Sequence, residues 1–108
     1  MSQAYLKAEV SRNALLICRE RISNKSTETS SDILELIQGQ LEWLVEYFEG
    51  HREMERNRLQ EIKIGFLAAR EIDDSDEEFI NALYNAQYVA DQTAAGLKID
   101  LKNIRDDS

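Results

Sequence analysis

The chain has 108 residues, of which 43 % are hydrophobic and 31 % charged, and its net charge is −8. This length supports one domain with a modest core, and this composition is that of a soluble globular protein rather than a disordered one. Its acidity disfavours nucleic acid and anionic lipid as main partners, because both require a basic footprint.

Helical structure is favoured throughout, because proline is absent and glycine occurs only four times. We therefore expect an all-α fold, a single bundle of about four helices that spans residues 1–108. No apolar run approaches the roughly 20 residues that cross a bilayer, and no signal peptide is visible. We expect a cytoplasmic protein without a membrane partner, and Cys18, the single cysteine, as a core residue.

The first helix is predicted over about Ser2–Ile22, followed by a polar loop at about residues 23–31. Its apolar residues recur at helical spacing. They are Tyr5, Ala8, Leu15 and Ile22, with Leu16 and Cys18 widening the stripe.

The second helix is predicted to begin at Asp32 as the N-cap, with Glu35 completing a capping box. One apolar stripe follows, composed of Ile33, Leu34, Ile37, Leu41, Leu44, Val45 and Phe48. Trp43 and Tyr47 lie beside this stripe. We favour core packing for them, because most large aromatic side chains are buried, and an interface edge is the alternative.

Gly50 and His51 interrupt the helical pattern of apolar residues, and the sequence leaves open whether the helix bends or stops there. A third helix is predicted over Leu59–Ile72. Its middle is apolar on nearly all sides, so we expect Phe66 in the core and Gly65 in close contact with another backbone.

An acidic turn follows, with six acids within residues 71–78: Glu71, Asp73, Asp74, Asp76, Glu77 and Glu78. Ser75 and Glu78 predict a capping box for the fourth helix. Because capping needs only one or two acids, the others suggest a role beyond stability. A calcium loop is excluded, because the required glycine and bidentate glutamate are absent.

The fourth helix is predicted to bury Phe79, Leu83, Ala86, Ala90 and Leu97 along one line. Tyr84 and Tyr88 are one turn apart and point away from that line. Gly96 is the predicted C-cap. The segment Leu97–Leu101 is expected to fold back on the bundle, and residues 103–108 to form a frayed tail.

Charge is segregated along the chain. Residues 28–49 and 71–91 carry only acidic charges, whereas residues 1–27 have five basic and two acidic side chains. This distribution fits a cationic protein partner. It fits equally well acidic helices that lie beside basic ones within the fold.

No catalytic constellation is visible. A single histidine, His51, and a single cysteine offer no Cys/His pair, and no glycine-rich loop is present. We therefore expect neither an enzyme, nor a cofactor, nor a metal site.

The last third of the chain carries a family resemblance. Its features are Gly65 and Ala69, an acidic turn with Asp73 and Asp76, then Ala82-Leu83, Ala86, Tyr88-Val89, Gly96-Leu97-Lys98 and Asp100-Leu101. In their order and spacing these residues resemble a family of small helical immunity proteins of type VI secretion. Members of that family neutralise NAD(P)+ glycohydrolase toxins.

The resemblance implies that the chain binds a cognate toxin and blocks its NAD-binding cleft, which we expect to be basic because it holds the phosphates of a dinucleotide. Asp73, Asp76 and Tyr88 occupy matching positions. The acidic pattern and the helical wheel add Asp74, Glu77 and Tyr84, with Trp43 and Tyr47 as a further surface. The alternative is a helical adaptor or structural protein that forms a homodimer or larger homo-oligomer through the Trp43/Tyr47 edge.

Overall fold

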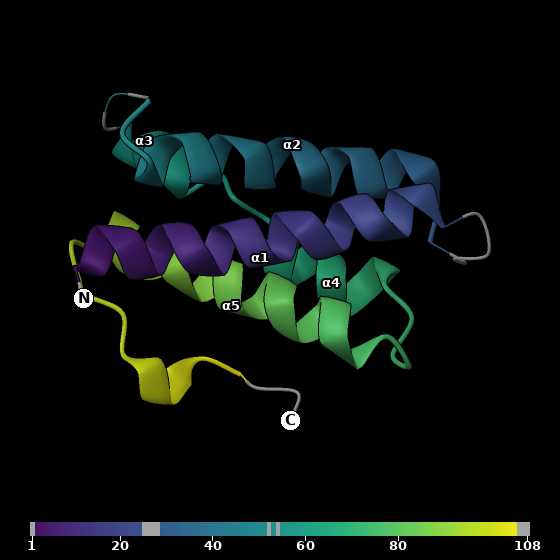
Figure 1. The fold of residues 1–108 in the computed structure, drawn as a ribbon. Coiled ribbons are helices and arrows are strands. Elements are labelled where there is room, and N and C mark those ends of the chain that lie inside the picture. The colour runs from purple at the N-terminus through teal and green to yellow at the C-terminus, as the bar shows by residue number, and fades with distance from the viewer. Residues whose placement is uncertain (1, 25–28, 52, 54, 106–108) are drawn as a thin grey trace.

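The computed structural model describes residues 2–24, 29–51, 53 and 55–105, and every regular element in these ranges is a helix (Figure 1). The elements are α1 (Gln3–Ser23), α2 (Ser31–Phe48), α3 (Arg56–Leu59), α4 (Ile64–Glu71), α5 (Glu77–Ala94) and the 3-10 helix η1 (Leu101–Asn103). The predicted all-α fold is confirmed. Within the described ranges, no helix has both the length and the apolar character needed to span a bilayer.

Helix α1 lies between α2 and α5 and packs against both, while α4 packs against α5 and α2 (Figure 1). The apolar stripes of these helices meet in one core, because each helix has only one face to bury. The largest fully buried side chains include Ile37, Leu41, Leu44, Leu59, Ile64, Phe79, Leu83 and Val89.

Serines begin the first two helices. Ser2 Oγ accepts a hydrogen bond from the Tyr5 N–H at 3.1 Å, and Ser30 Oγ accepts one from the Ile33 N–H at 3.3 Å. The predicted cap at Asp32 is therefore wrong. Asp32 lies in the first turn of α2, where its charge favours the positive helix end without capping it.

Glycines with a left-handed backbone conformation follow the C-terminal ends of α2 and α5. At α2, Gly50 has φ +82° and donates to Tyr47 O at 3.1 Å, while His51 donates to Glu46 O at 2.9 Å. This pair of bonds is a Schellman motif, so α2 ends at Phe48, just before Gly50, rather than bending. Gly96 (φ +75°) ends α5 with the same arrangement, as predicted.

The predicted third helix, Leu59–Ile72, is shorter in the structure: α4 begins only at Ile64, α3 has already ended at Leu59, and a side chain of α5 binds backbone groups near the start of α4. Gln87 of α5 accepts from the Gly65 N–H at 3.0 Å and donates to Ile62 O at 3.0 Å. A Cβ at Gly65 would lie 2.9 Å from Gln87 Cγ. The close approach expected at Gly65 is thus made by a side chain and not by another backbone.

Several residues expected in the core face solvent. Phe66 is 57 % exposed, and its ring lies 5.3 Å from the Arg70 guanidinium carbon. Tyr5, Leu16, Ile22 and Leu97 are also exposed. Helix α4 covers α5 with Ile64, Gly65 and Ala68 instead, which places Phe66 on the opposite side.

Candidate partner-binding surfaces

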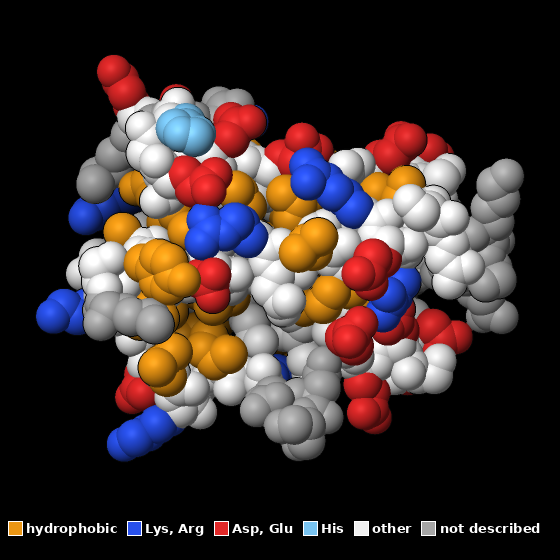
Figure 2. All heavy atoms as spheres, in the orientation of Figure 1, with side chains coloured by type: hydrophobic (Ala, Val, Ile, Leu, Met, Phe, Trp, Pro, Cys, Tyr) orange, Lys and Arg blue, Asp and Glu red, His pale blue; other side chains and the backbone are white. Residues whose placement is uncertain are grey.

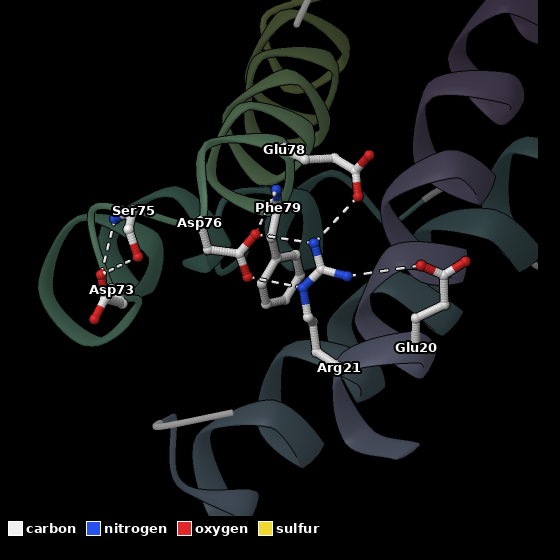
Figure 3. Close-up of polar contacts among 7 residues, drawn as sticks. All are labelled: Glu20, Arg21, Asp73, Ser75, Asp76, Glu78 and Phe79. Atoms are coloured by element: carbon white, nitrogen blue, oxygen red, sulfur yellow. Dashed lines mark hydrogen bonds and ion pairs between the residues drawn. The ribbon is translucent and has the colours of Figure 1, made fainter. Parts of the chain in front are cut away.

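Asp76, at the start of α5, is tied to Arg21 of α1 (Figure 3). Arg21 Nε donates to Asp76 Oδ2 at 2.7 Å, and Arg21 Nη2 donates to Asp76 Oδ1 at 2.9 Å. The same Nη2 reaches Glu78 Oε1 at 3.1 Å, and Glu20 lies 3.6 Å from Nη1. Asp76 also caps α5 by accepting from the Phe79 N–H at 3.4 Å.

This bidentate pair shifts both groups toward their charged forms. The hydrogen bonds that Arg21 donates lower the pKa of Asp76, and the same bonds raise the pKa of Arg21. The Arg21 guanidinium also lies 5.8 Å from the centre of the Phe79 ring. Asp76 therefore joins α1 to α5, which is the intramolecular alternative that the segregated charges had left open.

The other acids of the turn differ from Asp76. Asp73 Oδ1 accepts from the backbone N–H of Ser75 at 2.8 Å and from its hydroxyl at 2.7 Å. Ser75 is thus held inside the turn, and the predicted Ser75/Glu78 capping box is wrong. Asp74 and Glu77 are exposed and form no ion pair with another described residue. Acidic side chains gather at this end of the bundle (Figure 2).

Tyr84 and Tyr88 are half-buried against the chain's own C-terminal segment. The Arg105 guanidinium lies 4.6 Å from the centre of the Tyr84 ring. The Tyr88 hydroxyl accepts from the Asp100 N–H at 2.9 Å and from Asn103 Nδ2 at 3.2 Å. In this arrangement both tyrosines contact the C-terminal segment, so their rings are only partly available to a partner.

Two amide side chains clamp that segment in the manner of a short β-ladder. Gln3 exchanges two hydrogen bonds with the backbone of Ile99, at 2.8 and 3.2 Å. Asn85 exchanges two with the backbone of Arg105, at 2.7 and 3.0 Å. The segment therefore folds back on the bundle, as predicted, and stays attached through residue 105, beyond the expected start of fraying. Residues 106–108 of the expected frayed tail lie outside the described residues.

Trp43 is only 4 % exposed, which confirms the favoured core packing of this residue. It stacks on Tyr47 with ring centroids 5.3 Å apart, and the Arg58 guanidinium lies 5.4 Å from the centre of its ring. Tyr47 is half-buried and packs against the core. The Trp43/Tyr47 edge, which the alternative assigned to a homo-oligomer contact, thus packs largely against other residues of the same chain.

A groove of about 390 Å³ lies between α2 and the segment that joins α3 to α4. Residues lining it include Glu35, Leu36, Gly39, Trp43, Arg58 and Glu61. Gly39 is exposed in the middle of α2, where glycine costs about 1 kcal/mol relative to alanine. The Trp43 indole N–H has no hydrogen-bond partner among the described residues.

The prediction from sequence missed the residues that join distant segments: Gln3, Arg21, Asn85 and Gln87. Charge segregation was the only signal available for one of them, Arg21. Gln3, Asn85 and Gln87 gave no such signal in the sequence, because an amide side chain suits a solvated surface and a hydrogen bond to the backbone equally well.

The described residues form no cluster of three or more metal-ligating side chains. Cys18 is buried beside Leu34 O, and desolvation raises the pKa of its thiol to about 11. A thiol in this state is a poor nucleophile. Among the described residues, these surfaces offer exposed carboxylates and a groove lined in part by apolar side chains.

Comparison with known proteins gives a family match. A family model described as Tsi6 matches residues 7–92, from α1 into α5. Fifty residues are 40 % identical to the "Immune protein Tsi6" of Pseudomonas aeruginosa strain PAO1, over 46 % of this chain and 53 % of that protein. The matched region thus spans about half the length of this relative. No solved structure matches the chain significantly.

Proposed function

This chain belongs to the Tsi6 family, and from that membership we infer that it is an immunity protein of type VI secretion. It protects the cell that makes it by binding a cognate protein toxin. The observation that carries the proposal is the family match over residues 7–92, because these residues include most of the helical bundle and not one isolated motif.

The toxin in this proposal is an NAD(P)+ glycohydrolase, and the chain occludes its active site without any turnover of its own. A cleft that holds the phosphates of a dinucleotide tends to be basic, and an acidic protein is attracted to such a cleft. The net charge of −8 supports this pairing. The cytoplasm is the proposed site of action, because a delivered toxin of this class would meet its substrate there.

The eight residues proposed for partner binding fall into two groups. Asp74 and Glu77 are exposed and form no ion pair with another described residue, so they contribute to attraction, with Asp73 beside them. The others are engaged within the fold and act by shaping the surface: Asp76, Tyr84, Tyr88, Trp43 and Tyr47.

The proposal predicts stoichiometric inhibition. Purified chain should suppress NAD+ hydrolysis by the catalytic domain of the toxin encoded beside it, and the residual rate should reach baseline at an equimolar ratio. The chain alone, incubated with NAD+, should show no turnover. Hydrolysis that persists at a large molar excess, with no complex on size-exclusion chromatography, would contradict the proposal.

A further inference from the structure

The fold does not explain the glycine in the middle of α2. Gly39 lacks the left-handed backbone that Gly50 and Gly96 require, and a Cβ added there would meet nothing within 4 Å. A larger residue would therefore fit the bundle and favour the helix. Because Gly39 has no side chain, the groove that it lines with Leu36 and Trp43 stays open at this position.

The groove combines an apolar floor with an acidic rim. Leu36 is 50 % exposed, and the ring of Trp43 lies beside it. Glu35 and Glu61 stand at the rim without an ion pair to another described residue, and Arg58 is the one cation among the described residues that line the groove. Two carboxylates and one guanidinium give these lining residues a net charge of −1, which one further cation would neutralise.

We propose that this groove receives a lysine or arginine side chain of the toxin, and this inference rests on the proposed function. The aliphatic stem would lie on the exposed side chain of Leu36, beside the largely buried Trp43, and the cationic head would reach Glu35 or Glu61. Charge complementarity supports this occupant: α2 contains four acidic residues and no basic one. The proposal thus names α2 and the segment after α3 as the docking face.

Filling the groove provides the first test. Gly39→Leu should leave the melting temperature unchanged or raise it, yet weaken binding of the toxin's catalytic domain by about tenfold or more. Ala4→Leu, on the exposed side of α1, adds a leucine in place of another small residue away from the groove. This control should bind like the wild type. Equal affinities for both variants would overturn the proposal and leave the proposed function standing.

Charge changes test the nature of the occupant. Glu35→Gln combined with Glu61→Gln should speed dissociation about tenfold, because the cationic head loses its partners. Glu71→Gln combined with Glu77→Gln changes the net charge equally and should slow association without speeding dissociation. Arg58→Gln should bind as tightly as the wild type or more tightly. If the complex of Arg58→Gln dissociates faster than that of the Glu35→Gln/Glu61→Gln variant, the groove binds a hydrogen-bond acceptor or anion, and the proposed cationic occupant is wrong.

A spectroscopic readout locates the contact directly. Trp43 is the only tryptophan, so labelling the chain with 5-fluorotryptophan gives one ¹⁹F resonance at the groove. Addition of the unlabelled toxin domain should shift this resonance in the wild type, and much less in Gly39→Leu at the same concentration. A complex that forms without any shift would overturn the docking face. A wild-type dimer that becomes monomeric in Gly39→Leu would assign the groove to a second copy instead.

Discussion

Asp74 and Asp76 are two residues apart in one turn, yet their environments differ completely. Asp76 accepts two hydrogen bonds from Arg21 and is 24 % exposed, whereas Asp74 faces solvent. An ion pair with bidentate geometry and partial burial contributes more to stability than an exposed one. Reversing the charge of the whole turn would therefore test two properties together, because Asp76 supports the fold.

Asp76→Asn isolates the ion pair, because asparagine is also a good N-cap. We expect the free energy of unfolding at pH 7 to fall by about 1–2 kcal/mol. Because the pKa of Asp76 is lowered in the folded state, its contribution is complete above the unfolded pKa of about 3.9. That contribution is lost as the pH falls through the folded pKa.

Denaturant unfolding of wild type and variant between pH 7 and pH 3 measures this effect. The difference in stability should shrink toward acid pH. Glu78→Gln, whose side chain is 57 % exposed and makes one bond to Arg21, should cost at most about 0.5 kcal/mol. A constant difference between Asp76→Asn and wild type at every pH would exclude the ion pair as its cause.

The C-terminal segment is held at two separate points, and this makes it an element of the fold. Gln3 holds Ile99 against α1, and Asn85 holds Arg105 against α5. Ile99 is buried, and the segment covers Tyr84 and Tyr88. Each clamp satisfies one N–H and one C=O that have no helical partner.

Separate clamps predict separate local openings. Asn85→Ala should speed hydrogen exchange of the Arg105 amide while the Ile99 amide stays protected, and Gln3→Ala should do the reverse. Amide exchange followed by NMR gives both rates in one experiment, and each variant serves as the control for the other. If either change exposes both amides equally, the segment detaches as a single unit.

At the scale of the whole molecule, the acidic field acts before any contact forms. Long-range attraction depends on the summed charge and changes mainly the association rate. Asp74 and Glu77 suit a test of that field, because neither is tied to a residue that holds the fold together among those described.

Asp74→Lys combined with Glu77→Lys should slow association with the toxin domain and make the rate less sensitive to salt. Asp74→Asn combined with Glu77→Gln changes the charge by half as much and should give half the effect on the logarithm of the rate. Stopped-flow association at several ionic strengths, with a thermal melt of each variant, measures this. Unchanged rates in a folded variant would remove the acidic turn from the encounter.

The sequence by itself determined the helical class and most helix boundaries, because these depend on neighbours in the chain. The stripe of α2 buries Leu34, Ile37, Leu41 and Leu44, as its spacing predicts. Gly96 ends α5 for an equally local reason, since only glycine adopts its positive φ without strain. Even so, the capping residues of α2 and α5 were displaced by one or two positions, because several polar residues competed for each cap.

Only the tertiary structure decided which of the candidate residues are free. Asp76 lies 55 positions from Arg21, Ile99 lies 96 from Gln3, and Gly65 lies 22 from Gln87. No local pattern encodes such pairs, because each requires the bundle to bring two segments together. Phe66 shows the same limit: a helix apolar on all sides leaves its buried face undefined, and packing on α5 selected the face without the ring.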